Sequence, residues 1–179
     1  MTKAARAIII EGNKTLVMYR NKQGNEYFTL VGGQIAEGES MEQALVREVK
    51  EETGLHITGA QLVFIEDHQA PYNQQFIYLC TVAPHSDISL GEYSEEYEMN
   101  KLGVNIHKPV WVDVTSFEQL PFRTPNLHMA IIYCLRKGFP AQPVGLTGND
   151  YYAEEVQLWR SGLSGLPKRL AHKLRKPKH

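Results

Sequence analysis

Apolar residues near the N-terminus form short runs of the kind found in β-strands, with turn residues between them. The runs at 7–10 and 15–19 flank Gly12 and Asn13, and this arrangement predicts a β-hairpin. The next run, 27–31, leads directly into a pair of glycines, which indicates that another group passes close to the backbone there.

Helical spacing of apolar residues follows in two segments. Ser40 is a suitable N-cap with Gln43 at the capping-box position, and Gly54 supplies a C-cap, so a helix of about 13 residues is predicted between them. Leucine and isoleucine at helical spacing in 125–137 predict a second packed helix.

Three further runs, 61–65, 75–82 and 109–114, are rich in β-branched and aromatic residues and are expected to be strands. The long acidic stretch 85–108 has no predicted element. Strands interrupted by helices predict a layered α/β or α+β domain.

Charge divides the 179-residue chain into two parts. Residues 1–138 carry 12 Lys+Arg and 17 Asp+Glu, a net charge of -5, whereas residues 139–179 carry 7 and 3, a net charge of +4. Glycines and prolines cluster after residue 137. We therefore expect a main domain over 1–138 and a C-terminal extension over 139–179, made of a connector, a short helix and a basic tail.

Composition excludes several classes of protein. With 42% hydrophobic and 22% charged residues, the chain can bury a core and is not disordered throughout. Its overall net charge of -1 is not typical of a nucleic-acid-binding protein. The first apolar run stops at Glu11, too early for a signal peptide or a membrane span, so a cytoplasmic protein without a transmembrane segment is expected. Cys80 and Cys134 lack metal-ligand spacing and are expected to be buried, reduced thiols.

Four glutamates, Glu39, Glu48, Glu51 and Glu52, fall within fourteen residues. Glu48 and Glu52 share one helix face, where like charges cost about 0.2–0.5 kcal/mol, and the negative end of the helix dipole adds to the repulsion. A solvated acidic face is the ordinary explanation, whereas a bound cation would offset the repulsion. Carboxylates without Cys or His favour Mg²⁺ or Mn²⁺ over zinc.

The segment 33–55 reads G-x5-E-x7-R-E-U-x-E-E-x-G-U, where U is a bulky aliphatic residue. This segment resembles the Nudix box without a gap, and nine constrained positions over 23 residues make a chance match very improbable. The matching residues are Gly33, Glu39, Arg47, Glu48, Val49, Glu51, Glu52, Gly54 and Leu55. The resemblance implies the Nudix fold, a mixed β-sheet sandwiched between helices in α/β/α layers, here with a basic C-terminal extension.

The resemblance also implies roles for these residues, because Nudix proteins hydrolyse a nucleoside diphosphate linked to another group with divalent cations bound by the box. Carried over, Glu48 and Glu52 are the principal metal ligands, and Glu51 and the carbonyl of Gly33 are additional ones. Arg47 would orient these carboxylates. Glu39 would fix the loop or bind metal through water.

The general base is a box glutamate in some members of the family and a glutamate from a distant loop in others. In the second group, that glutamate completes the metal site. The acidic stretch before Trp111 offers Glu96 first and Glu95 second for this role. A solvated acidic loop is the alternative explanation.

Substrate specificity is expected to come mainly from residues outside the box. Phe28 and Tyr72 are candidates for stacking on a base, although aromatic residues of half-buried strands more often belong to the core. The turn of Gly32 and Gly33 and the neighbouring Glu39 are further candidates for substrate contact.

The leading functional hypothesis is a Mg²⁺-dependent hydrolase, with Mn²⁺ as a substitute, that cleaves a nucleoside triphosphate to monophosphate and diphosphate. An oxidised purine nucleotide is one candidate substrate. Hydrolysis of ADP-ribose or another nucleotide sugar is an alternative within the family. A non-catalytic nucleotide-sensing module is an alternative of another class. A prenyl diphosphate isomerase ranks last because it uses a catalytic cysteine, whereas Cys80 lies in an apolar strand.

The last twelve residues, 168–179, contain six basic side chains and no acid. Such a tail could bind nucleic acid, an acidic partner or a membrane surface, but a solubilising tail is the simpler explanation. The main expected partner is a small-molecule nucleotide. A homodimer is a second expected partner, because many members of the family dimerise.

Overall fold

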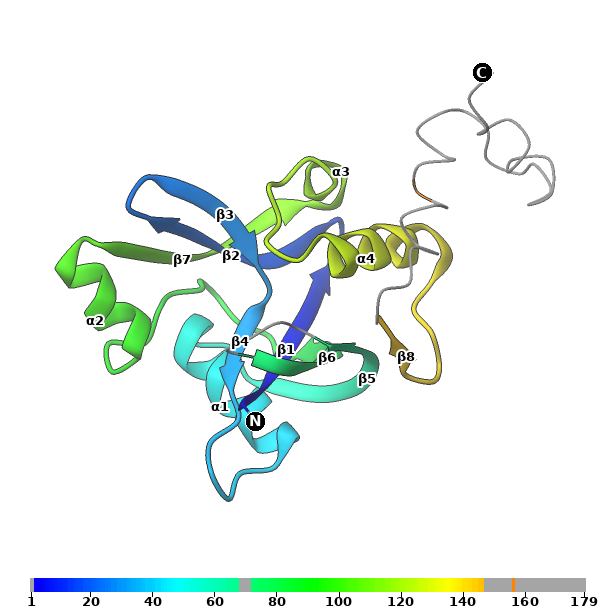
Figure 1. The fold of residues 1–179 in the computed structure, drawn as a ribbon, viewed down its shortest axis with the longest axis horizontal. Helices are drawn as coiled ribbons and strands as arrows, with labels where there is room; N and C mark the ends of the chain where they lie inside the picture. The colour runs from blue at the N-terminus through cyan, green and yellow to red at the C-terminus, as the bar shows by residue number, and fades with distance from the viewer. Residues whose placement is uncertain (1, 68–71, 147–155, 157–179) are drawn as a thin grey trace.

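A computed structural model describes residues 2–67, 72–146 and 156 of the chain (Figure 1). Its strands are β1 (Thr2–Glu11), β2 (Lys14–Lys22), β3 (Asn25–Thr29), β4 (Val31–Gln34), β5 (Ile57–Asp67), β6 (Tyr72–Val82), β7 (Asn105–Asp113) and β8 (Val144–Gly145). Its helices are α1 (Met41–Thr53), α2 (Glu95–Leu102), α3 (Val114–Phe117) and α4 (Pro125–Lys137).

These strands form one mixed sheet in the order β3-β2-β1-β6-β5-β8, with β4 paired to β1 and β7 paired to β2. The predicted hairpin is present, because β1 and β2 pair antiparallel around the turn at residues 12 and 13. The part of β1 that is farther from the turn pairs antiparallel with β4 and parallel with β6. The central strand β1 therefore lies between β6 and β4, the strand that contains Gly32 and Gly33.

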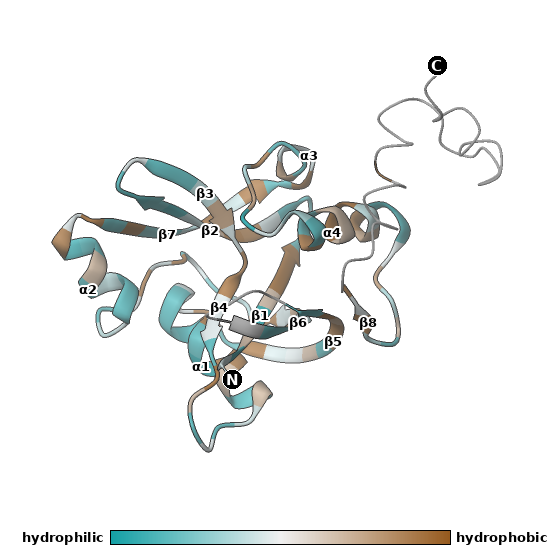
Figure 2. Ribbon diagram, in the orientation of Figure 1, coloured by the Kyte–Doolittle hydropathy of each residue, from teal (hydrophilic) through white to brown (hydrophobic). Residues whose placement is uncertain are grey.

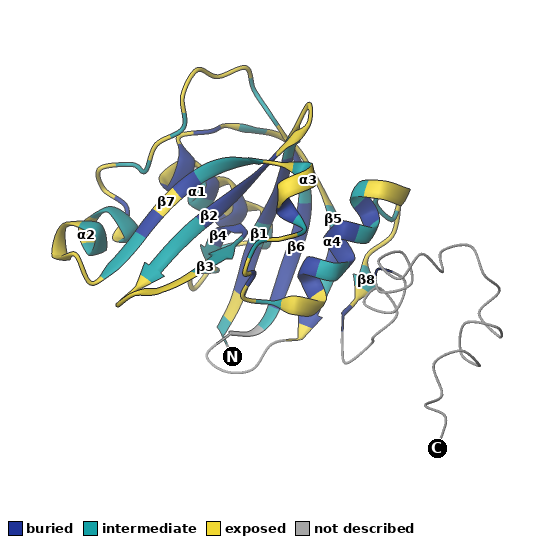
Figure 3. Ribbon diagram, turned by 90° about the horizontal axis from the view of Figure 1, so that it is seen from above, coloured by how far each residue is buried: buried dark blue, intermediate teal, exposed yellow. Residues whose placement is uncertain are grey.

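Each face of the sheet is covered by one long helix (Figure 3). Helix α1 packs Ala44, Leu45 and Val49 into one hydrophobic core, and α4 packs Leu127 and Ile131 into another. Apolar residues follow the central strands between the two helices (Figure 2). Since burying a Leu or Ile side chain contributes about 1.5–3 kcal/mol, both cores hold the sheet in place. The expected layers, a mixed sheet between helices, are confirmed.

Helix α1, here called the box helix because it carries Glu48, Glu51 and Glu52, has the caps that its sequence predicts. The Ser40 hydroxyl accepts a hydrogen bond from the Gln43 amide at 3.1 Å, and the Gln43 side chain accepts one from the Ser40 amide at 2.8 Å. At the other end Gly54 adopts φ 77° and donates its amide to the Lys50 carbonyl at 2.8 Å. These local contacts fix the register of the glutamates along α1.

Two elements differ from the sequence-based expectation. The single strand expected over 27–31 is divided at Leu30 into β3, which pairs with β2, and β4, which pairs with β1. The acidic stretch 85–108, for which no element was predicted, contains α2 and the start of β7. None of the residues of α2 is buried, so this helix has no apolar stripe that the sequence could reveal.

The first residues of the C-terminal extension pack on the main domain. Strand β8 pairs parallel with β5, and Leu146 and Val156 are buried in the core on the α4 side. The predicted short helix and the basic tail over 168–179 lie outside the described residues, and the boundary at residue 138 stays a prediction. In the part of the chain that the structure describes, no helix is long and apolar enough to cross a membrane.

Candidate active site

Residues from β1, β2, β4, α1 and α2 meet around one pocket. Its lining combines carboxylate and guanidinium groups with the two glycines of β4. The lining residues are Arg6, Arg20, Gly32, Gly33, Gln34, Arg47, Glu48, Glu51, Glu95 and Glu96. Guanidinium groups bind phosphate oxygens, and carboxylates bind hard cations. The two kinds of group together suit a polyphosphate bound with a cation.

Glu52 is buried beside this pocket, with only 1% of its surface exposed. The amide of Gly32 donates a hydrogen bond of 2.5 Å to its Oε2. Burial and, secondly, the nearby charge of Glu96 raise the pKa of Glu52 to about 8, although Arg6 acts in the opposite direction. A cation bound at this carboxylate would favour the charged form instead.

Glu48 lies one helical turn before Glu52, against Gly33 of β4. Its pKa is raised, chiefly by burial, while the guanidinium of Arg47 at 2.8 Å lowers it. A Cβ atom at position 33 would overlap the Glu48 carboxylate. Only glycine at this position leaves room for Glu48 in the observed conformation.

Arg47 holds the box together from one side of α1. Its Nε and Nη2 each donate to the Glu39 carboxylate at 2.9 Å, and its Nη1 donates to Glu48 at 2.8 Å and to Glu51 at 3.2 Å. This contact with Arg47, together with the Ala36 amide, lowers the pKa of Glu39 to about 2. Glu39 therefore links the loop before α1 to the helix through the Ala36 amide and Arg47, and both roles that the resemblance implies for it stay predictions.

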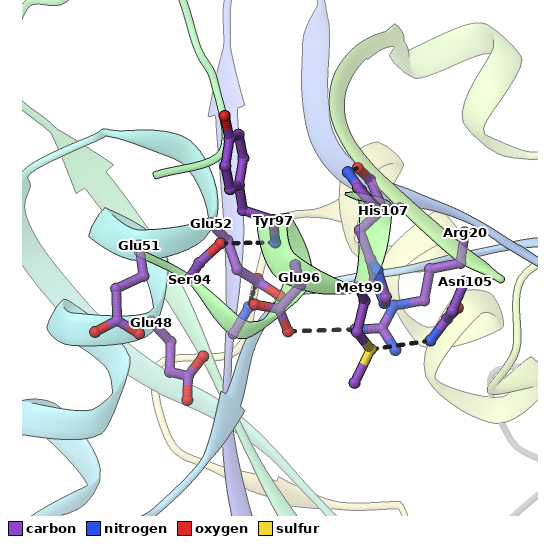
Figure 4. Close-up of polar contacts among 12 residues, drawn as sticks. Arg20, Glu48, Glu51, Glu52, Ser94, Glu96, Tyr97, Met99, Asn105 and His107 are labelled. Carbon is purple, nitrogen blue, oxygen red and sulfur yellow. Dashed lines mark hydrogen bonds and ion pairs between the residues drawn. The ribbon is translucent and has the colours of Figure 1, made fainter. Parts of the chain in front are cut away.

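Helix α2 brings Glu96 to the pocket (Figure 4). Its carboxylate lies 4.0 Å from Nη2 of Arg20 and points toward Glu52. The segment before α2 is anchored to the end of the box helix, because the Gly91 amide donates to the Glu51 carbonyl at 2.7 Å. Ser94 caps α2 by accepting the amide of Tyr97. Glu95 also lines the pocket, and Glu98 instead pairs with Lys101 at the surface.

The donor set fits a hard divalent cation in type. Glu48, Glu51, Glu52 and Glu96 offer only oxygen atoms, and their mutual repulsion raises the pKa of Glu48 and Glu52 beyond the effect of burial. Among the described residues, no three acidic, histidine or cysteine side chains already surround one metal-sized position. Coordination of one ion therefore requires these carboxylates to turn toward a common point.

The structure brings most of the predicted site residues together, but not all. Gly32, Gly33, Arg47, Glu48, Glu51 and Glu96 line the pocket. Phe28 does not, because its ring packs edge-on against Tyr19 at 5.6 Å and against the core on the α4 side. Tyr72 begins β6 and pairs with Thr2, but its side chain lies outside the described part of the chain.

Two arginines of the pocket were missed by sequence reasoning. Arg6 donates to Gln75 Oε1 at 3.1 Å and to the carbonyl of Gly32, and Arg20 approaches Glu96. One signal was available, since Arg6 is the sole charged residue between Ala4 and Ile10 in a strand that is otherwise apolar. A charged residue on a buried strand is unusual without a partner or a function.

The chain is similar to known proteins in both sequence and structure. The NUDIX domain matches residues 1–130. The chain is 25% identical over 165 residues to the Nudix hydrolase YvcI of Bacillus subtilis, covering 88% of this chain and 91% of that protein. It is 32% identical over 81 residues to the CTP pyrophosphohydrolase of Escherichia coli, covering 44% of this chain and 58% of that protein.

A solved structure of a NUDIX hydrolase from Nitrosomonas europaea aligns with a TM-score of 0.58 at 22% identity, covering 76% of this chain and 89% of that one. This likeness concerns the fold alone.

Proposed function

The chain belongs to the NUDIX family of hydrolases acting on nucleoside diphosphate derivatives, and from that premise we propose that it is a Mg²⁺-dependent nucleoside triphosphate pyrophosphohydrolase. The products would be a nucleoside monophosphate and inorganic diphosphate. The observation that carries this proposal is the meeting of Glu48, Glu51 and Glu96 with Arg6 and Arg20 around one pocket.

The charge of each side chain in the pocket decides which part of the ligand it would bind. The guanidinium groups of Arg6 and Arg20 would bind phosphate oxygens that are not on the metal. Glu48, Glu51, Glu52 and Glu96, with the Gly33 carbonyl, would hold Mg²⁺. Family members generally use divalent ions, and an all-oxygen donor set favours Mg²⁺, with Mn²⁺ as a substitute. When bound, Mg²⁺ neutralises phosphate charge and lowers the pKa of the attacking water.

Residues of the chain would also position the groups that take part in the reaction. Arg47 would keep Glu48 and Glu51 on the side of α1 that faces the pocket, since it donates to both. Glu96 or a box glutamate would accept the proton of the attacking water. Glu96 is favoured among the distant glutamates because it lies between Glu52 and Arg20.

A triphosphate is favoured over ADP-ribose or another nucleotide sugar because the Escherichia coli relative is named for hydrolysis of CTP. Oxidised purine triphosphates remain in the same substrate class.

The test is a product-resolved hydrolysis assay with Mg²⁺ on canonical and oxidised nucleoside triphosphates, ADP-ribose, nucleotide sugars and dinucleoside polyphosphates. We expect triphosphates to give monophosphate and diphosphate, and Glu52→Gln to abolish turnover while the protein stays folded. Glu98→Gln is the matched control, because Glu98 faces solvent. Nucleotide binding without turnover of any compound would instead support a sensing module.

A further inference from the structure

Helix α2 reaches the candidate active site with little support from the two cores. None of its residues is buried, and among the described elements it packs mainly along the strand β7 (Figure 1). Burial of apolar side chains is what usually fixes a helix on a sheet, so the placement of α2 depends on polar contacts instead. Glu96 shares that dependence, since it lines the pocket from α2.

The segment that enters α2 is tied to the end of the box helix. The Gly91 amide donates a hydrogen bond to the Glu51 carbonyl at 2.7 Å, and the Ser89 amide donates one to the Thr53 carbonyl at 3.1 Å. The last four carbonyls of a helix have no partner within the helix. These two bonds therefore satisfy the end of α1 and fix where the chain begins its approach to α2.

The other end of α2 is tied to β7 by the side chain of Asn100. Its Nδ2 donates to the His107 carbonyl at 2.7 Å, and its Oδ1 accepts the His107 amide at 2.6 Å. A residue of a neighbouring antiparallel strand makes the same pair of bonds, so one side-chain amide takes the place of a strand at the edge of β7. Because His107 is buried, its amide and carbonyl need these partners.

This contact lies where it can control the position of Glu96. Asn100 follows Glu96 by four residues, so the two side chains share one face of α2. His107 is the cross-strand neighbour of Arg20, and Nη2 of Arg20 lies 4.0 Å from the Glu96 carboxylate. One turn of α2 therefore contacts neighbouring positions of β7 and β2. A shift of α2 along β7 would move Glu96 away from Arg20 and the pocket.

We propose that Asn100 is a positioning residue, which fixes α2 on the edge of β7 and thereby holds Glu96 at the pocket. The inference rests on the proposed function for the reaction that Glu96 serves. Asn100 does not line the pocket, so it would affect turnover only through Glu96. The competing explanation is that Asn100 merely satisfies the backbone of His107, in which case its loss has no specific link to Glu96.

The first experiment measures the placement of α2 without turnover. Amide hydrogen exchange of the full chain is followed by NMR, without nucleotide or metal. In Asn100→Ala, we expect the His107 amide and the helical amides of α2 to exchange about 10-fold faster, and those of α1 to stay within about 2-fold. Alanine is a better helix former than asparagine, so a lower helix propensity cannot explain a loosened α2.

The matched control is Asn13→Ala. The Nδ2 of Asn13 also bonds β7, donating to Asp113 Oδ1 at 3.1 Å, but at the far end of the strand and at the surface. This variant should leave exchange in α2 and the kinetic constants unchanged.

The second experiment links Asn100 to Glu96 in turnover. With Mg²⁺, Asn100→Ala should lower kcat for a nucleoside triphosphate about 10- to 100-fold and change KM less than about 3-fold, because Asn100 lies outside the pocket. In a Glu96→Gln background the same substitution should lower kcat less than about 2-fold, since the group that it positions is already absent. A residue with a purely structural role would have the same effect in both backgrounds.

Two results would overturn the inference: unchanged exchange in α2 of Asn100→Ala, or an equal change in kcat with and without Glu96→Gln. A wild-type protein that hydrolyses no nucleotide would overturn the proposed function instead, and faster exchange in α2 would still support the tether. Circular dichroism shows that each variant is folded. If Asn100→Ala does not fold, Asn100→Gln replaces it in both experiments, because it keeps both polar groups but displaces the helix by one methylene.

Discussion

The carboxylate of Glu48 packs against the Cα atom of Gly33, in the place that a side chain at position 33 would occupy. Gly33→Ala should therefore displace Glu48. The backbone of Gly33 is not in the left-handed region, so the fold should tolerate the methyl group. We expect kcat to fall by about 10²-fold, the order expected for a misplacement of about 1 Å, while the melting temperature changes little.

The matched control is Gly145→Ala in β8, where an added Cβ would meet nothing within 4 Å. Steady-state kinetics and thermal melts of both variants decide the outcome. Equal activity of the two variants would show that the position of Glu48 does not matter for turnover.

Arg47 acts through the carboxylates that it holds rather than through its charge alone. Lysine at this position keeps the charge but has one nitrogen, so it cannot reach Glu39, Glu48 and Glu51 together. Arg47→Lys should lower kcat/KM by about 10- to 100-fold. Arg136→Lys, which alters the ion pair of Arg136 on α4 with Glu118 after α3, should leave kcat/KM unchanged, and a similar loss in both variants would argue against the orienting role.

Two glutamates of α2 that are two residues apart in sequence should differ sharply in their effect on turnover. Glu96 lines the pocket, whereas Glu98 has a side chain that is 63% exposed and pairs with Lys101. Glu96→Gln should reduce kcat about 10²-fold or more if it accepts the proton or binds the metal. The ratio of the two variants in the same assay measures this, and a ratio near one would return the role of general base to the box.

His107 makes the stability of the protein depend on pH. It is 2% exposed, its Nδ1 has no hydrogen-bond partner in the described part of the chain, and burial and the charge of Arg20 lower its pKa to about 4. Between about pH 4 and 6.5 the unfolded chain therefore binds a proton that the folded protein does not. The contribution of His107 to the free energy of unfolding is complete above pH 6.5 and falls by about 3 kcal/mol toward pH 4.

Urea unfolding at pH 7, 5.5 and 4.5 checks this dependence. His107→Phe should lose less stability on acidification than the wild type, and His56→Gln, at an exposed position, should lose as much. If His107→Phe follows the wild-type curve, another buried group causes the acid sensitivity.

Local signals account for what the sequence predicted well. The box helix begins at Ser40 and ends at Gly54 as expected because its caps lie within a few residues of the segment that they stop. Sequence reasoning missed α2 because none of its residues is buried, so its sequence carries no apolar stripe. It also missed Arg6, whose role depends on the parallel pairing of β1 with β6, and this pairing joins segments with no local signal for each other.

The two cores on opposite faces of the sheet also bear on how such a protein changes over time. The box carboxylates belong to α1, which packs into one core, whereas α4 packs into the other. Because the two cores share no residue, substitutions that repack the α4 layer should leave the packing under α1 undisturbed. The α4 layer is therefore expected to vary in sequence more freely than the layer that positions the carboxylates.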